Sequence, residues 1–348
     1  MRIDMIVFFC TVSLWLCLTG CGGGGNGDAS TETASILDNM GGYLLDGFSS
    51  EMALYGDRAM IVNSDNSMTS YEIHFIDITD PTSPVQEAII KTSHRVTSIA
   101  LSNDKAWFSE QTYQNGTWAG SIHEVSLSNF AIARSLEIEA APNAFLVNNE
   151  YGYIVDQHGL RVLDMNDFTL AETPLVGSPS SYVISIDGER AYVGGQYNAI
   201  DIFDISMPAT PLLLGSFSNP FEGSPHGMIT FDSFTAIAAG GIGIAVFDTR
   251  LPLSITLKAI QDTEGWAESI AIDGHYCYLA DGESGLLVID ISNMTAPVVK
   301  GTYDLGGYAR RVIHSGNHVC VLLNEKGLVI FEKKREEPFS PESRDAQI

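Results

Sequence analysis

Few residues of this chain stand at the spacings that a catalytic or metal site needs. His314 and His318 are four apart, but the intervening Ser315-Gly316-Asn317 predicts a hairpin turn and not one helical face, so no zinc site is expected. Gly240-Gly241-Ile242-Gly243 resembles a nucleotide loop in composition only, because a strand-like run follows it and not a helix. Asp65 lacks the spacing and closing glutamate of a calcium loop. With no G-x-S-x-G, H-E-x-x-H or P-loop pattern either, we predict no catalytic residue, no metal and no cofactor.

The charge balance limits the possible partners. The 348 residues include 18 Lys+Arg and 43 Asp+Glu, which gives a formal charge of −25. Binding to nucleic acid, or to anionic lipid through a basic surface, requires the opposite sign, so both modes are excluded. With 45% hydrophobic residues the chain is able to bury a large core.

The elements that must position any site are short strands in a repeat. Residues 269–304 contain four strand-like runs separated by turn signals, and the third run ends on an acidic residue. This third run occurs seven times, with its acidic residue at Asp77, Glu124, Asp164, Asp204, Asp248, Asp290 and Glu332. The spacings of 40 to 47 residues predict an all-β fold, a seven-bladed β-propeller of four-stranded antiparallel blades. Six or eight blades are the alternatives.

Residues 285–304, GLLVIDISNMTAPVVKGTYD, resemble the LVIVD repeat, a bacterial β-propeller motif named after its third strand. Weaker copies such as AIDIFDISMPATPLLLGSF extend the resemblance over about residues 43–332. The resemblance implies the fold and no activity, because the shared positions have structural explanations. The acidic residue is expected to accept hydrogen bonds from the following turn. Pro84, Pro211 and Pro297 are expected just before outer edge strands, which tolerate a missing donor.

The seventh repeat has three strands and then a charged tail without a fourth. Residues 43–48, YLLDGF, resemble the fourth strands of other copies, so we predict that they join the last blade and close the ring. Pairing the two ends of the chain removes an open sheet edge. The β-propeller is then expected over residues 43–334, followed by a disordered polar tail over 335–348.

The amino terminus predicts export and an anchor. Residues 5–18 form an apolar run of 14, which is short for a membrane span and typical of a signal peptide. Leu18-Thr19-Gly20-Cys21 resembles the bacterial lipobox, which implies removal of residues 1–20 and lipidation, such as palmitate, on Cys21. Residues 21–42 are expected to form a Gly-rich tether. Gly22 after the cysteine favours the outer membrane; an ordinary secretory signal is the alternative.

Two cysteines, Cys277 and Cys320, remain in the expected propeller, both in apolar strand-like runs. An oxidising compartment permits a disulfide. Neighbouring sheets stack about 10 Å apart, however, whereas bridged Cα atoms lie within roughly 7 Å. Buried free thiols are therefore favoured over a bridge.

Candidate ligand-binding residues follow from aligning the copies on their first hairpin turn. In propellers the loops before first strands and between second and third strands surround one mouth of the channel, an inference that rests on fold analogy. Residues that differ between copies at these positions are where specificity is expected, although solvent exposure alone also makes such a surface polar. The candidates are Glu51, Asn143, His158, Tyr182, His226, Trp266, Glu268 and Arg310.

The second copy contains a longer segment, Glu110–Gly120, with Tyr113 and Trp118. Exposed aromatic side chains contact sugars and protein partners well. We therefore predict a partner-binding surface there; the alternative is that Trp118 folds back over the edge of its blade.

Two classes of function fit these patterns. The first is a non-catalytic, lipid-anchored binding or scaffold module of the cell envelope for a protein, peptide or carbohydrate partner. The second is a hydrolase or lactonase-like enzyme in which Glu51, Glu268, His226 and Arg310 surround a channel metal. The second class requires several inward ligands from different blades.

Overall fold

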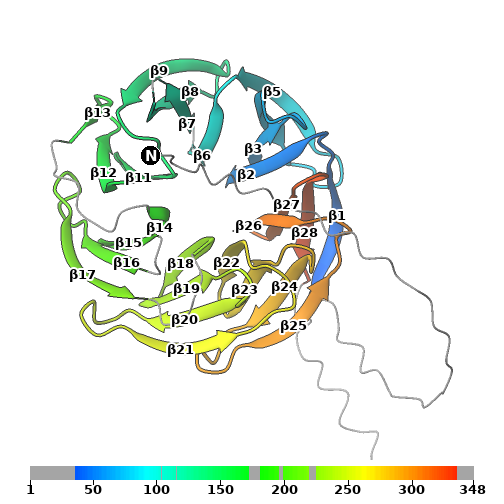
Figure 1. The fold of residues 1–348 in the computed structure, drawn as a ribbon. Helices are drawn as coiled ribbons and strands as arrows, with labels where there is room; N and C mark the ends of the chain where they lie inside the picture. The colour runs from blue at the N-terminus through cyan, green and yellow to red at the C-terminus, as the bar shows by residue number, and fades with distance from the viewer. Residues whose placement is uncertain are drawn as a thin grey trace, which may run out of the picture. The chain divides into compact units, whose positions relative to one another are not determined.

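The computed structural model describes residues 36–334 except 103, 115, 172–180, 196–198 and 219–224. Within these residues all regular secondary structure is β, in seven four-stranded antiparallel sheets arranged as a ring (Figure 1). The first strand of each blade lies toward the centre of the ring and the fourth at its circumference (Figure 1). No helix that is long and apolar enough to cross a membrane occurs in the described part of the chain.

The first four blades follow the chain in order. Blade 1 consists of β2 (Phe48–Tyr55), β3 (Arg58–Ser64), β4 (Tyr71–Asp77) and β5 (Val85–Thr92). Blade 2 consists of β6 (Arg95–Leu101), β7 (Lys105–Gln114), β8 (Thr117–Ser126) and β9 (Ala131–Ile138). Blade 3 consists of β10 (Ala144–Asn148), β11 (Tyr151–Asp156), β12 (Gly159–Asp164) and β13 (Thr169–Leu170). Blade 4 consists of β14 (Ser181–Asp187), β15 (Arg190–Gly195), β16 (Ala199–Asp204) and β17 (Leu212–Ser218).

The last three blades complete the ring. Blade 5 consists of β18 (Gly227–Phe231), β19 (Phe234–Ala238), β20 (Ile244–Asp248) and β21 (Thr256–Gln261). Blade 6 consists of β22 (Ser269–Asp273), β23 (Tyr276–Ala280), β24 (Leu286–Asp290) and β25 (Val298–Tyr303). Blade 7 consists of β26 (Ala309–Ser315), β27 (His318–Leu323), β28 (Gly327–Lys333) and the amino-terminal strand β1 (Leu37–Tyr43). The predicted all-β, seven-bladed fold is confirmed.

The core lies between the blades. Each pair of neighbouring blades encloses its own cluster of buried apolar side chains, including the pair formed by blades 7 and 1. Between blades 5 and 6, for example, Val246 packs with Leu279 and Ile289. Both faces of a blade are therefore buried, which explains why the second and third strands are nearly continuous apolar runs.

The repeated acidic residue has the structural role expected of it. In five blades it is an aspartate whose Oδ1 accepts a hydrogen bond from the backbone N–H two residues later, as at Asp290 and Ser292, 2.9 Å apart. Pro84, Pro211 and Pro297 stand directly before β5, β17 and β25, as predicted. A glycine also opens the third strand: Gly285 has φ +77°, and a Cβ there would lie 2.2 Å from the carbonyl oxygen of Tyr303.

An amino-terminal strand closes the ring, but not at the predicted residues. The prediction placed it at 43–48, whereas β1 spans Leu37–Tyr43 and residues 44–47 lead into β2. Residues 37–42, which were expected to belong to the tether, are therefore part of blade 7. Residues 37–42 have no apolar run because β1 is an edge strand in which only Leu37 is buried. The backbone of β1 pairs closely with β28, and a Cβ on Gly42 would lie 2.0 Å from the carbonyl oxygen of Leu328.

The two cysteines are buried free thiols, as favoured by the sequence. Cys277 packs between blades 5 and 6, whereas Cys320 packs between blades 7 and 1. Burial raises the pKa of both thiols, that of Cys320 to about 12. Neither sulfur is therefore a reactive thiolate at neutral pH.

Candidate binding site at the mouth of the central channel

The innermost strands carry a repeated irregularity at the mouth of the channel. In β2, β6, β14 and β26 the pairing register shifts by one residue near the start of the strand. The extra residues are Ser50, Thr97, Tyr182 and Arg310, and all four line the same cavity. Bulges redirect side chains in this way beside functional sites.

This cavity has a volume of about 940 Å³ and receives residues from every blade. A second hollow of about 240 Å³ shares Glu51, Thr97, Asn143, Tyr182 and His226 with it and extends along the innermost strands. Six of the eight predicted ligand-binding residues line the larger cavity: Glu51, Asn143, Tyr182, His226, Glu268 and Arg310. The structure therefore brings together residues that lie up to 259 positions apart in the chain.

Glu268 is the centre of one polar cluster in this cavity. Tyr308 Oη donates a hydrogen bond of 2.7 Å to Glu268 Oε1, and Arg310 Nη1 lies 3.4 Å from the same oxygen. His226 Nδ1 is 3.6 Å from Glu268 Oε2. Burial raises the pKa of Glu268, but His226, Arg310 and Tyr308 together outweigh burial and lower it to about 2. Glu268 is thus a fixed carboxylate at neutral pH.

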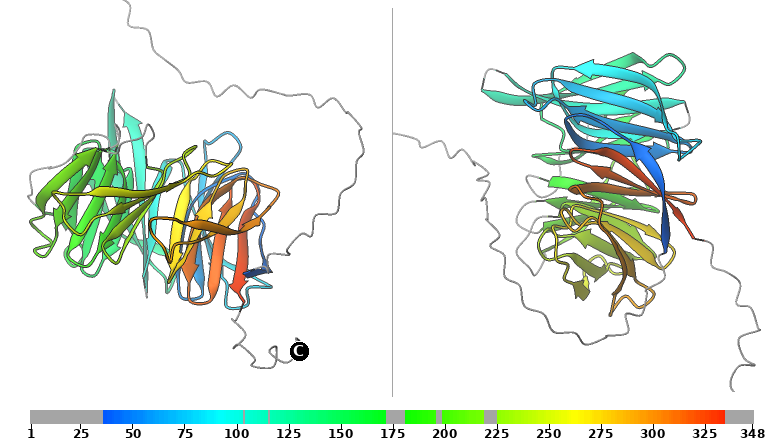
Figure 2. Two further views of the ribbon diagram at one scale, coloured as in Figure 1. Left: turned by 90° about the horizontal axis from the view of Figure 1, so that it is seen from below. Right: turned by 90° about the vertical axis from the view of Figure 1, so that its right-hand side faces the viewer.

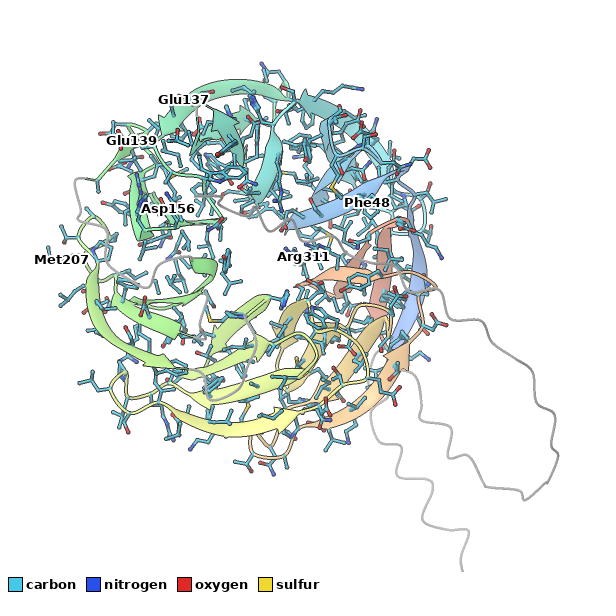
Figure 3. All side chains as sticks on the ribbon, in the orientation of Figure 1. Phe48, Glu137, Glu139, Asp156, Met207 and Arg311 are labelled. Carbon is cyan, nitrogen blue, oxygen red and sulfur yellow. The ribbon has the colours of Figure 1, made fainter. Side chains whose placement is uncertain are left out.

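Glu51 forms the second cluster with Arg311 of the neighbouring blade. Arg311 Nη2 lies 2.6 Å from Glu51 Oε1 and Arg311 Nε lies 3.0 Å from Glu51 Oε2, a bidentate pair. Figure 3 shows Arg311 at the inner side of blade 7, and Phe48 at the start of β2 lines the same cavity. Burial lowers the pKa of Arg311, but the charge and hydrogen bonds of Glu51 outweigh it, so the pKa is raised. The pair joins blades 7 and 1 and neutralises both charges.

These pairings bear on the enzymatic alternative. A carboxylate with a pKa near 2 is a weak base, and a general acid must hold a proton near the working pH. Within the described residues, no three His, Cys, Asp or Glu side chains are grouped as a metal ion would need.

The long hairpin of blade 2 stands at the same mouth. Strands β7 and β8 have ten residues each and project beyond their neighbours in Figure 2. Tyr113 and Trp118 are paired directly across the hairpin, with ring centroids 5.0 Å apart at 52°. Tyr113 is 61% exposed and Trp118 47% exposed, so Trp118 leaves much of its surface to solvent instead of being buried over the blade.

Two predicted residues lie outside the cavity lining. His158 follows Asp156 in the β11–β12 turn, where its backbone N–H donates 2.7 Å to Asp156 Oδ1. The Trp266 ring lies over Gly240 of the preceding blade, where an added Cβ would be 2.9 Å from the ring. Tyr308 covers Gly282 in the same way one blade later. Trp266 thus has a repeated packing role between blades.

The cavity also contains residues that the sequence did not indicate. Arg311 was missed because the alignment selected Arg310, the bulged residue directly before it. Arg95 was missed because it meets Gln111, a residue of the predicted segment Glu110–Gly120, only when β6 and β7 come together. Tyr71 reaches the cavity from the first position of β4, and Asn324 from the connection between β27 and β28.

Comparison with known proteins agrees with this architecture. The family model for the LVIVD repeat matches residues 180–219, 264–305 and 306–331. No curated protein matches the sequence. The fold and its repeats define the chain as a seven-bladed β-propeller. More particularly, it contains LVIVD repeats, which the family model matches in blades 4, 6 and 7.

Solved structures share the fold at low sequence identity. The computationally designed Ika8 protein is 12% identical with a TM-score of 0.59, covering 84% of this chain and 98% of its own. The β-propeller domain of Cps50 (Swd1) from Myceliophteria thermophila is 10% identical with a TM-score of 0.64, covering 86% of this chain and 100% of its own. These similarities concern the fold alone.

Proposed function

We propose that this protein is a lipid-anchored binding or scaffold module of the bacterial cell envelope. It presents the mouth of its channel and the β7–β8 hairpin to a protein, peptide or carbohydrate partner. The observation that carries the proposal is a cavity at the channel mouth that is lined by different polar side chains from each blade, in the innermost strand or directly before it. Residues that recur in the blades form the ring, whereas the residues that line the channel mouth differ from blade to blade.

The proposed anchor rests on the sequence of the amino terminus. The lipobox-like Leu18-Thr19-Gly20-Cys21 and the glycines after it supply an acylated cysteine and a tether. The surplus of acidic residues disfavours attachment through charge, so lipid is the means of attachment. Cell fractionation tests this: Cys21→Ser is expected to leave the protein in the soluble fraction or as uncleaved precursor. Unchanged recovery in the outer membrane would contradict the anchor.

Co-purification from envelope extracts tests the binding surface. The double variant Tyr113→Ala with Trp118→Ala is expected to keep the thermal unfolding of the wild type and to lose its partners. Met207→Ala with Leu253→Ala is the matched control, because these exposed apolar side chains lie at the opposite end of the blades. If the hairpin variant recovers the same partners as the wild type, the hairpin is not the binding surface.

A further inference from the structure

The β7–β8 hairpin has two faces, and strand alternation identifies the one that carries the aromatic pair. Trp107 packs with Phe145 of blade 3, so odd-numbered residues of β7 face blade 3. The β7–β8 pairing continues without a register shift to Tyr113, which places Gln111 and Tyr113 on that same face. Trp118 is directly opposite Tyr113 and shares its face.

Arg95 belongs to the same face and extends it into the cavity. Arg95 is the register partner of Gln111, and both residues line the channel mouth. Two residues along a strand cover roughly 7 Å, so the backbone of the aromatic pair lies about that far beyond the Arg95–Gln111 pair. We call Arg95, Gln111, Tyr113 and Trp118 together the hairpin face.

Arg95 differs from the other two arginines of the mouth. Arg311 is paired with Glu51, and Arg310 lies beside Glu268. Arg95 is exposed, and no carboxylate of the described residues lies within ion-pair distance of it. Its charge is therefore available to a ligand, and a guanidinium binds carboxylates through two parallel hydrogen bonds.

The charge of the mouth contrasts with that of the chain. The cavity is lined by three arginines and two glutamates, whereas the whole chain carries a formal charge of −25. The other polar side chains of the cavity are the imidazole of His226 and amides and hydroxyls, such as Gln111, Asn143 and Tyr182. These groups match the hydroxyls of a sugar, and exposed aromatic rings offer flat surfaces to sugar rings.

We propose that the hairpin face binds an acidic saccharide. Sugar rings stack on Tyr113 and Trp118, and a carboxylate on the saccharide is bound by Arg95, with Gln111 beside it. The inference rests on the proposed binding function and names the chemistry of its ligand. A saccharide is favoured over a peptide because charged, amide and hydroxyl side chains make up most of the residues that line the mouth.

The test uses a panel of immobilised uronic-acid and sialic-acid oligosaccharides, each beside its carboxyl-reduced, neutral counterpart. The wild-type propeller is expected to bind at least one acidic member at least about tenfold more tightly than the neutral form. Arg95→Gln should abolish that preference, and Tyr113→Ala with Trp118→Ala should abolish retention. Arg250→Gln, an exposed arginine at the opposite end of blade 5, is the matched control and should bind as the wild type does.

Three outcomes would overturn the proposal: no acidic saccharide is retained, acidic and neutral forms are retained equally, or Arg95→Gln keeps the preference. Retention of Asp- and Glu-rich peptides without any saccharide would assign the site to peptides instead. Unfolding midpoints of all variants show whether a loss of binding is a loss of folding. The proposed binding function is tested independently of the saccharide: it is contradicted if the Tyr113→Ala, Trp118→Ala variant still captures every envelope partner.

Discussion

The two ends of the blades are built on different principles. At the end where each third strand finishes, similar turns recur, with an aspartate such as Asp290 bonded to the following backbone N–H. At the channel mouth each blade contributes a different side chain, for example Glu51, Tyr182 and Arg310. A feature that recurs around the ring has a structural explanation in every copy. Residues that break the repeat are therefore the ones to examine for binding.

The largest effect on stability is expected at a repeated core position. Ile289 is fully buried in the third strand of blade 6 and packs against blade 5. Ile289→Ala should cost about 3 kcal/mol, because it leaves a cavity between two blades. Urea unfolding measures this cost, with the exposed Val298→Ala of the same blade as control. A loss below about 1 kcal/mol would show that the blades tolerate cavities at repeated positions.

Glu268 tests the comparison between the two ends of the blades, because it lies at the channel mouth and is also expected to stabilise the folded protein. Its pKa is lowered from the ordinary value of 4.5 to about 2, so the folded state favours the carboxylate. The ionised Glu268 carboxylate therefore stabilises the folded protein fully above about pH 4.5. This contribution to the free energy of unfolding is lost as the pH falls toward 2. Since Arg310 and His226 are partly exposed, Glu268→Gln should cost about 2 kcal/mol at pH 7.

Urea unfolding of the wild type and Glu268→Gln at several pH values measures this dependence. The difference between the two proteins should be constant above about pH 5 and shrink at lower pH. A difference that does not change between pH 7 and pH 3 would mean that Glu268 is not held as an ion pair.

A smaller effect is expected at the repeated turn. Asp290 accepts the hydrogen bond from Ser292 N, and Lys300 Nζ lies 3.6 Å from its Oδ2. Asp290→Ala should cost about 1 kcal/mol, the net contribution of one such hydrogen bond. Asp290→Asn keeps the acceptor and should recover most of the loss in thermal unfolding. Equal losses in the two variants would assign the effect to the charge.

The smallest change in stability is expected at the hairpin face. Tyr113 and Trp118 contact each other beyond the body of blade 2, so replacing both by alanine should cost less than about 1 kcal/mol. Differential scanning calorimetry measures this cost. A loss as large as that of Ile289→Ala would contradict the separation between positions that build the ring and positions that bind.

The sequence predicted best what the repeat determines. The seven acidic residues located the third strands, and alignment of the first hairpins identified six residues of one cavity. Prediction from the sequence failed where a contact depends on two segments that are far apart in the chain. Strand β1, which pairs with β28, has no apolar pattern, since it is an edge strand in which only Leu37 is buried. Likewise, the Glu51–Arg311 pair joins residues 260 positions apart in neighbouring blades, which an alignment of single blades does not show.

Trp266 shows that a residue that differs from its counterparts can also have a packing role in the fold. The indole covers Gly240, and Tyr308 covers Gly282 at the equivalent place. The glycine beneath each ring could have indicated this packing role. A difference between copies therefore has to be compared with the packing of the side chain before it is assigned to binding.

The central claim is that the channel mouth, and not the opposite end of the blades, meets the partner. Photo-crosslinking in the native cell tests it directly, with a photoreactive residue at Tyr182 in the mouth or at Met207 at the opposite end and outer circumference (Figure 3). We predict a specific crosslinked partner, identified by mass spectrometry, from position 182 and none from position 207. Crosslinks from position 207 alone would contradict the claim.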